Sequence, residues 1–336
     1  MTETAEPEPA AAGGRLLEVQ DLVVSFPTPD GVVEAVRGVS FGVERGRTLA
    51  IVGESGSGKS VSTHAIVGLI RGARVSGRAL FEGRDLLAMP ADDLRRVRGA
   101  GIGMIFQSPQ SSLHPYYRVG WQLEEAIRAH ERVEKKAARA RAIELLRLVG
   151  IPRAERRVDD YPHQFSGGML QRTMIAIAVA LNPRLLIADE PTTALDVTVQ
   201  AQIIDLMRRL QAEFGTAILM ITHDLGVVAG MADEIAVMYA GQVMETAPRR
   251  PLYRHSHHPY TEGLLRSLPR ADAPRARLTP IRGQPPSLIG PPPGCPFQAR
   301  CDYVMDLCVE RPPLAPVQGD PGHRSACWLP PDRWAQ

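Results

Sequence analysis

Short apolar runs separated by amphipathic segments make up most of the chain. The run at residues 48–52 ends abruptly at Gly53, which is typical of a strand buried on both faces of a sheet. Helical patterns fall between this run and others like it, and strands that alternate with helices predict a mainly parallel α/β sheet covered by helices. The other runs of this kind are residues 102–106, 185–188, 217–222 and 235–239.

Further strands and helices are expected outside these runs. Residues 16–26 and 32–43 carry apolar and β-branched residues on either side of a turn with Pro and Gly, which predicts a pair of strands. Residues 134–149 have apolar residues at helical spacing and are followed by Gly and Pro, which stop helices. Together with residues 121–130, they predict a helix-rich stretch between two strand-rich ones.

The composition changes after about residue 247. Residues 248–336 hold 18 of the 29 prolines and all four cysteines, so we expect a separate, irregular C-terminal module that does not continue the sheet. Residues 1–14 are acidic and rich in Ala and Pro, without a basic stretch followed by an apolar one. They predict a disordered tail and not an export signal.

Charge and hydropathy exclude several classes of protein. The 39 basic and 37 acidic side chains nearly balance, which argues against a protein that holds nucleic acid by bulk charge. No apolar run reaches the roughly 18 to 20 residues that cross a bilayer. We therefore expect a reducing, cytosolic compartment, without structural disulfides. Only three of the basic residues are Lys, so a Lys inside a motif is informative.

A glycine-rich motif follows the strand at residues 48–52. Gly53-Glu-Ser-Gly-Ser-Gly-Lys-Ser60 fits the pattern G-x-x-x-x-G-K-[ST], whose glycines let backbone N–H groups surround a phosphate at the start of a helix. Lys59 is expected between the β- and γ-phosphates, and the Ser60 hydroxyl on Mg²⁺. The motif predicts a nucleoside triphosphate site. Its expected contact residues are Gly53, Glu54, Ser55, Gly56, Ser57, Gly58, Lys59, Ser60 and Val61.

Polar residues follow three other strands of the predicted sheet. We expect Asp189 to hold Mg²⁺ and Glu190 to orient or polarise the attacking water. His223 is placed to sense the γ-phosphate, and Gln107 to offer its amide to Mg²⁺ or to water. The catalytic residues are thus predicted to be Glu190, His223, Gln107 and Lys59.

These motifs, with Phe165-Ser-Gly-Gly-Met-Leu-Gln-Arg172, resemble the ATP-binding subunit of ABC transporters over about residues 15–250. The resemblance implies a P-loop NTPase fold, namely an ABC nucleotide-binding domain with a helical subdomain at about residues 108–180. It also implies an ATPase that uses ATP and Mg²⁺.

The same resemblance implies a second half-site. Ser166, Gly167 and Gly168 would open a helix over residues 169–182 and bind the γ-phosphate of ATP held by the opposite subunit. Free N–H groups at a helix start suit such an anion site. Two chains would then form a head-to-tail dimer around two ATP molecules.

Three more positions take their expected roles from the resemblance. Ala194-Leu-Asp196 resembles the loop that lies across the dimer interface, which puts Asp196 near the nucleotide. Phe26 resembles the aromatic residue that stacks on adenine, with a core position in a strand as the alternative; Phe41 sits too near the phosphate loop for that role. Met169 stands where many members carry Gln.

Several motifs resemble the peptide-importer branch of the family. The resemblance implies the D-type ATPase subunit, peripheral on the cytoplasmic face of the cell membrane, with a C-terminal module at residues 251–336. The implied partners are a second, nonidentical ATPase subunit, two transmembrane permease subunits and an extracytoplasmic substrate-binding protein, and no nucleic acid. The motifs are Tyr161-Pro-His-Gln-Phe-Ser166, Leu195-Asp-Val-Thr-Val-Gln-Ala-Gln202, His258-Pro-Tyr-Thr261, Ile281-Arg-Gly-Gln-Pro-Pro286 and Gly294-Cys-Pro-Phe297.

Two other functions stay open from the sequence. One is a soluble ABC ATPase of DNA repair or translation, although this chain has neither a long coiled-coil insertion nor a second cassette. The other is an iron–sulfur protein in which ATP only switches the shape of a regulator.

The cysteines form a cluster of their own. Cys295, Cys301, Cys308 and Cys327 have the spacing C-x5-C-x6-C-x18-C, and four thiolates in a reducing compartment favour a [4Fe–4S] cluster, with Zn²⁺ or unligated thiols as alternatives. Some peptide importers resemble this pattern and carry an iron–sulfur cluster. His323 is a possible substitute ligand. Separately, His255, His257 and His258 are expected to form a surface cluster.

Overall fold

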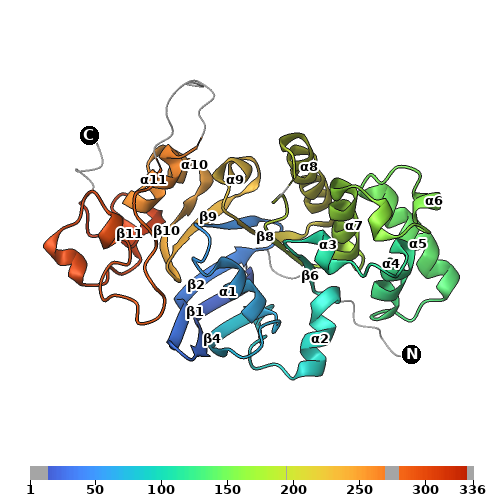
Figure 1. Cartoon of the computed structure of the whole chain (residues 1–336), viewed down its shortest axis with the longest axis horizontal. Helices are drawn as coiled ribbons and strands as arrows, with labels where there is room; N and C mark the ends of the chain where they lie inside the picture. The colour runs from blue at the N-terminus through green and yellow to red at the C-terminus, as the bar shows by residue number, and fades with distance from the viewer. Residues whose placement is uncertain (1–13, 194, 269–279, 331–336) are drawn as a thin grey trace, which may run out of the picture.

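The computed structural model describes residues 14–193, 195–268 and 280–330, and the predicted N-terminal tail lies almost entirely outside them. Within these residues the strands form one sheet of four strands and one of eight. Figure 1 shows the larger sheet crossing the middle of the molecule, with the helices of residues 109–179 at one end and the C-terminal elements at the other.

The larger sheet has a parallel centre. The prediction of a mainly parallel sheet from five apolar runs is confirmed, and each strand end lies within one residue of its predicted position. All five strands are almost completely buried, which explains why their sequences are continuous apolar runs. In spatial order they are β9 (Glu234–Tyr239), β3 (Thr48–Val52), β8 (Ala217–Thr222), β7 (Leu185–Asp189) and β6 (Ile102–Ile105).

The smaller sheet is antiparallel. The predicted strand pair is confirmed as a hairpin in which Thr28 lies opposite Gly31, but it belongs to this separate sheet and not to the parallel one. The sequence pattern did not predict β4, because residues 74–78 are exposed and carry no apolar alternation. In spatial order the strands are β2 (Gly31–Glu44), β1 (Arg15–Thr28), β4 (Arg74–Phe81) and β5 (Arg84–Asp85).

Helices cover the sheets and form the end of the molecule that contains residues 109–179. Those predicted at residues 121–130, 134–149 and 169–182 are present with shifted ends, as α4, α5 and α7. The helices are α1 (Lys59–Ile66), α2 (Ala91–Ala100), α3 (Pro109–Ser112), α4 (Val119–Arg128), α5 (Lys135–Leu148), α6 (Ala154–Arg157), α7 (Gly167–Val179), α8 (Val197–Phe214), α9 (Leu225–Met231), α10 (Arg249–Arg254) and α11 (Pro259–Arg266).

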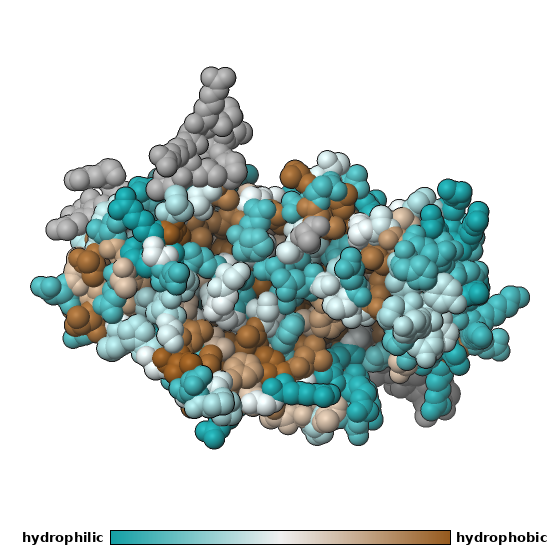
Figure 2. Space-filling view, in the orientation of Figure 1, coloured by the Kyte–Doolittle hydropathy of each residue, from teal (hydrophilic) through white to brown (hydrophobic). Residues whose placement is uncertain are grey.

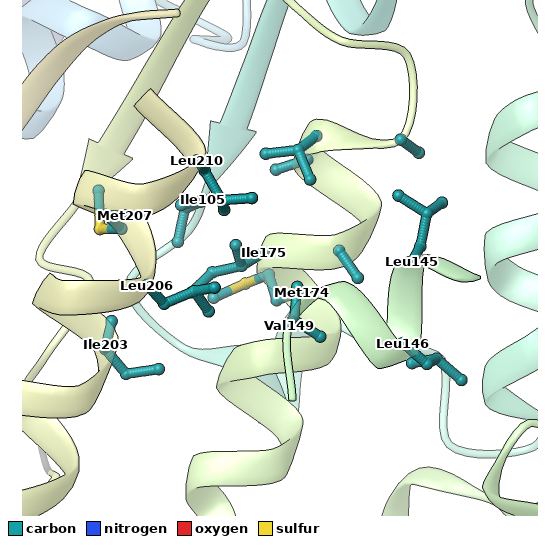
Figure 3. Packing of buried hydrophobic residues seen from close by; sticks show 14 of the residues in the cluster. Ile105, Leu145, Leu146, Val149, Met174, Ile175, Ile203, Leu206, Met207 and Leu210 are labelled. Carbon is teal, nitrogen blue, oxygen red and sulfur yellow. The ribbon is translucent and has the colours of Figure 1, made fainter. Parts of the chain in front are cut away.

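One buried cluster joins the helical end to the parallel sheet. Figure 3 shows side chains from α5, α7 and α8 meeting beside Ile105 of β6. Leu146 of α5, Ile175 of α7 and Ile203 of α8 are all fully buried in this cluster. The helices that follow Gln107 are therefore packed firmly against β6, β7 and β8.

The expectation that the C-terminal residues do not continue the sheet is wrong. β10 (Gln242–Pro248) pairs with β12 (Asp320–Ser325), which pairs with β11 (Ala315–Val317), so the last residues extend the eight-stranded sheet. Proline does not prevent this: Pro316 lies in the outermost strand, and Pro321 is the second residue of β12, before Arg324 and Ser325, which pair with β10.

The C-terminal residues also share a core with the parallel part of the eight-stranded sheet. Val52 at the end of β3, Tyr239 of β9, Tyr260 of α11 and Phe297 belong to one buried cluster. The rings of Tyr239, Tyr260 and Phe297 lie 4.6 to 5.4 Å apart, centroid to centroid. Through these aromatic contacts the C-terminal segment, which comprises residues 249–268 and 280–330, packs next to the end of β3, where the phosphate loop begins.

The surface is largely hydrophilic on the face shown in Figure 2, with apolar side chains in separate patches. One exposed apolar group, Val304, Leu307 and Val309, lies among the cysteines of the C-terminal segment. In the part of the chain that the structure describes, no helix is both long and apolar enough to cross a bilayer.

The cluster in Figure 3 yields a test of the fold. Leu146→Ala should lower the free energy of unfolding by about 2–5 kcal/mol, because it removes a fully buried side chain and leaves a cavity. Urea unfolding followed by circular dichroism measures the change. Glu144→Ala, on the exposed face of the same helix, should change it by less than about 0.5 kcal/mol. Equal losses in both variants would contradict this assignment of the core.

Candidate active site

The phosphate loop connects β3 to α1, and two of its glycines are required by close backbone contacts. A Cβ atom on Gly53 would lie 2.1 Å from the carbonyl oxygen of Met238, and one on Gly58 would lie 2.4 Å from that of Ala35. Gly58 also has a φ of +98°, which L side chains rarely adopt. The loop thus lies against β9 and β2 more closely than any side chain allows.

Lys59 points into the loop that precedes it. Its Nζ donates to the backbone oxygens of Gly53 and Glu54, at 2.7 and 2.9 Å. Burial lowers the pKa of Lys59, and the charges of Glu190 and Asp189 oppose that shift. The ammonium group is held at the centre of the loop, where the motif requires it for contact with phosphate.

Ser60 and Asp189, both of which are expected to hold Mg²⁺, lie in direct contact. The hydroxyl Oγ of Ser60 donates to Asp189 Oδ1 at 2.7 Å, across 129 residues of sequence. Hydroxyl and carboxylate oxygens are hard donors that suit Mg²⁺. His64, which the sequence did not single out, adds a second contact to Asp189, with Nε2 3.2 Å from Asp189 Oδ2.

Glu190 is the centre of a network that brings the predicted catalytic residues together. Gln107 Nε2 donates to Glu190 Oε2 at 2.8 Å, and Thr193 Oγ1 donates to the same oxygen at 2.9 Å. His223 Nδ1 lies 3.2 Å from Glu190 Oε1. Glu190 itself has a φ of +48°, a strained conformation that is typical of catalytic sites. Residues from the ends of β6, β7 and β8 therefore converge on one carboxylate.

The predicted second half-site lies apart from the chain's own phosphate loop. Ser166 caps α7, its Oγ accepting the backbone N–H of Met169 at 3.4 Å. Ser166 and Gly167 are exposed, and Gly168 is half-buried. Figure 1 shows α7 at the helical end of the molecule, apart from α1. The free N–H groups at the start of α7 are open to an anion from outside the chain.

Three other predicted positions have simpler surroundings. Asp196 caps α8, its Oδ1 accepting the N–H of Val199 at 3.0 Å, while Ala194 lies outside the described residues. Phe26 lies opposite Val33 in the antiparallel hairpin and packs partly buried against that sheet's core. Its contact with adenine stays a prediction.

The C-terminal segment reaches the phosphate loop, a contact that the sequence analysis missed. Tyr260 of the His-Pro-Tyr motif accepts the N–H of Glu54 through its hydroxyl at 2.9 Å. Arg300, next to Cys301, donates to both carboxylate oxygens of Glu54, at 2.6 and 3.0 Å. These partners are 206 and 246 residues from Glu54, so no local pattern reveals them.

The four cysteines are free thiols that lie near one another. Burial raises the pKa of Cys301 to about 11 and that of Cys327 to about 12, and the neighbouring thiols add to both shifts. Backbone N–H groups donate to the sulfur of Cys301 and to that of Cys327, each at 3.4 Å. Within residues 14–193, 195–268 and 280–330, no group of three or more His, Cys, Asp or Glu has the arrangement of a metal site.

Two expectations about histidines are wrong. His323 does not lie free to replace a cysteine, because its Nε2 lies 2.6 Å from Oε1 of Glu245 and both side chains are buried. His258 is not part of a surface cluster: it is buried, and its Nδ1 accepts the N–H of Tyr260 at 3.0 Å. Burial lowers the pKa of His258 to about 3, so it is a neutral cap of α11.

A phosphate loop, a contact between Ser60 and Asp189, and an exposed Ser-Gly-Gly helix start on one α/β sheet define the class of an ABC ATPase. Residues 36–193 match the family described as "ABC transporter", and residues 244–308 match "Oligopeptide/dipeptide transporter, C-terminal region". The chain is therefore an ATPase of the ABC type. The second match begins in β10, inside the eight-stranded sheet, and ends at Cys308.

Curated relatives extend the match to nearly the whole chain. The oligopeptide transport ATP-binding protein OppD of Bacillus subtilis is 52% identical over 94% of this chain and 89% of its own length. The dipeptide transport ATP-binding protein DppD of the same organism is 51% identical over 95% of this chain and 96% of its own. The chain belongs to the family of oligopeptide and dipeptide ABC transport ATP-binding proteins.

Solved structures agree on the fold. The dimeric structure of the bacterial ABC transporter cassette MJ0796 covers 70% of this chain and 99% of its own, with a TM-score of 0.63 and 28% identity. A post-hydrolysis state of the same cassette, bound to ADP and phosphate, matches equally well, with a TM-score of 0.63. These relatives support neither a role in DNA repair or translation nor a purely regulatory iron–sulfur protein.

The network around Glu190 yields a test of catalysis. Glu190→Gln should lower kcat for ATP hydrolysis by about 10²–10⁴-fold, because an amide cannot accept a proton from the attacking water. The dissociation constant for MgATP should change by less than about threefold, since Lys59 and the loop are untouched. Steady-state hydrolysis and equilibrium titration measure the two constants. A variant that hydrolyses ATP at the normal rate would remove Glu190 from the mechanism.

Proposed function

We propose that this chain hydrolyses ATP to power the import of peptides, as a motor subunit on the cytoplasmic face of a membrane transporter. The observation that carries the proposal is the contact of Glu190 with both Gln107 and His223 beside the phosphate loop. It occurs in a chain that is 52% identical, over 94% of its length, to an oligopeptide transport ATP-binding protein.

The site supplies each function that hydrolysis needs. Lys59 and the loop N–H groups bind the phosphates, and Glu190 orients the attacking water. His223 lies on the solvent side of Glu190, with about half of its side chain exposed, where a γ-phosphate would contact it. Ser60 and Asp189 would hold Mg²⁺, which neutralises charge on the phosphates when bound.

We propose further that two ATPase subunits face each other and that each completes the other's site. The exposed start of α7 supports this arrangement, since its N–H groups have no phosphate in their own chain. One similar cassette has been solved as a dimer. The partner that we propose is a nonidentical ATPase of the same family.

The proposed contact with the permease subunits lies at the helical end. Tyr116, Tyr117 and Trp121 are 84%, 44% and 42% exposed, and the rings of Tyr117 and Trp121 are stacked with centroids 4.1 Å apart. Large exposed aromatic groups of this kind are typical of protein interfaces. An apolar cavity of about 240 Å³ lies between β6, α4 and α7, and Phe106 in its wall precedes Gln107. A permease segment in this cavity would therefore be linked to Glu190 through Gln107.

Reconstitution tests the transport function. Proteoliposomes that contain this chain, a second ATPase, two permease subunits and a substrate-binding protein should accumulate a labelled peptide only with ATP. Glu190→Gln should abolish uptake, because the site binds but does not cleave ATP. Trp121→Ala should uncouple uptake from hydrolysis, while Phe214→Ala, an exposed aromatic position at the end of α8 and outside this surface, is the matched control. Undiminished uptake by the Trp121 variant would place the permease contact elsewhere.

We also propose that Cys295, Cys301, Cys308 and Cys327 hold a [4Fe–4S] cluster, with Zn²⁺ as the other candidate. Support comes from the closeness of the thiols and from the backbone N–H groups that point at two sulfurs. The segment leaves Val304, Leu307 and Val309 exposed, so it gains little stability from a core of its own. When bound, a metal centre would cross-link the segment.

Metal analysis and alkylation test this cluster. Anaerobically purified protein should contain iron and inorganic sulfide. In metal-free protein at pH 8, iodoacetamide should modify Cys301 and Cys327 at least about tenfold more slowly than an ordinary thiol, since their raised pKa values leave little thiolate until the pH nears 11. Folded, iron-free protein with four rapidly alkylated cysteines would contradict the proposal.

A further inference from the structure

The phosphate loop carries an acidic side chain where it must bind a polyanion. Glu54 follows the first glycine of the loop, and its carboxylate is about a quarter exposed. The loop N–H groups attract phosphate, whereas an unpaired carboxylate at this position repels it. The negative charge of Glu54 must therefore be balanced for the loop to bind a nucleotide well.

Arg300 provides that balance from the C-terminal segment. Nη1 and Nη2 of Arg300 donate to the two carboxylate oxygens of Glu54, at 2.6 and 3.0 Å, in a bidentate pair. The Arg300 side chain is only 4% exposed, so the pair is shielded from water on the arginine side. A buried, planar pair of this kind is directional as well as attractive.

The guanidinium group is itself fixed on every side. Its remaining N–H groups donate to the backbone oxygens of Arg282 and Ile281, at 2.8 and 3.3 Å, and Nη1 also donates to the hydroxyl of Tyr239 at 3.2 Å. The rings of Tyr239 and Phe297 lie against it, with Cζ 5.7 and 5.9 Å from their centroids. These contacts fix Arg300 independently of Glu54, so Arg300 holds the Glu54 carboxylate in one position.

All the polar groups of Glu54 are engaged. The C-terminal segment takes two of them: Arg300 binds the carboxylate, and the Tyr260 hydroxyl accepts the backbone N–H. The third, the backbone oxygen, accepts the Nζ of Lys59 at 2.9 Å. A displacement of Glu54 would thus be passed directly to the lysine that binds the phosphates.

We propose that Arg300 is a positioning residue for nucleotide binding, which neutralises Glu54 and fixes the phosphate loop through it. The affinity of the loop for nucleotide then depends on the placement of the C-terminal segment that carries Arg300 and the adjacent Cys301. The inference rests on the proposed ATP-driven function only in that this loop binds the nucleotide.

A double-mutant cycle on the full chain tests the proposal, with MgADP as the probe and calorimetric titration as the measurement. Arg300→Gln should raise the dissociation constant about tenfold, a common size for coupling between charged groups in contact. In the Glu54→Gln background the same substitution should raise it by less than about threefold, because no carboxylate is left uncompensated. Equal losses in both backgrounds would overturn the proposal and reduce Arg300 to a packing residue.

Two further variants control the experiment. Arg266→Gln removes another paired arginine of the C-terminal region, which binds Glu262 on α11 and does not touch the loop; it should leave the dissociation constant within about twofold. If Arg300→Gln does not fold, Arg300→Lys replaces it in both backgrounds, since it keeps the charge but loses the bidentate fork. A wild-type chain that fails to bind MgADP would refute both the proposed function and this inference, whereas equal losses in both backgrounds would overturn this inference alone.

Discussion

The active site depends on the register of three parallel strands. β3 and β8 end at Val52 and Thr222, which lie directly opposite each other, and β7 continues to Asp189, opposite Ile221. Glu190 extends this pairing through its N–H, which donates to the oxygen of Ile221 at 2.8 Å. The phosphate loop, Glu190 and His223 follow these strand ends, so they meet at one edge of the sheet. A slip of one residue would turn each of them to the opposite face.

A second constraint acts on the same edge from behind. The composition of the C-terminal residues predicted a separate module. In the structure, Tyr260 and Phe297 are buried with Val52 in one cluster. The loop is therefore held from two directions: by the sheet that precedes it and by a segment more than 200 residues further along the chain. Glu54 is the residue at which both meet, which explains how an acidic side chain can occupy a loop that binds phosphate.

The sequence was sufficient for features that are local. The continuous apolar run and the glycine-rich motif after it place Lys59 and Ser60 at the start of α1, close to the end of β3, because the loop between strand and helix is short. Gln107 was expected at the site from its position after a strand alone, and the structure places it on Glu190. The sequence did not predict partners that lie far apart along the chain. No motif marks Arg300, and His64 lies within α1, outside the glycine-rich motif. Proline content misled the prediction for the C-terminal strands, because Pro316 lies in the outermost strand and Pro321 lies near the start of β12, and strands tolerate proline at such positions.

The position of β11 also limits how this chain can associate. Without β12 and β11, β10 would offer a row of open backbone donors and acceptors, to which a strand of another molecule could add. β11 is three residues long and contains Pro316, so it closes this side of the sheet against such growth. This edge of the sheet is therefore not offered to a strand of another molecule, and a partner on this side must bind through side chains.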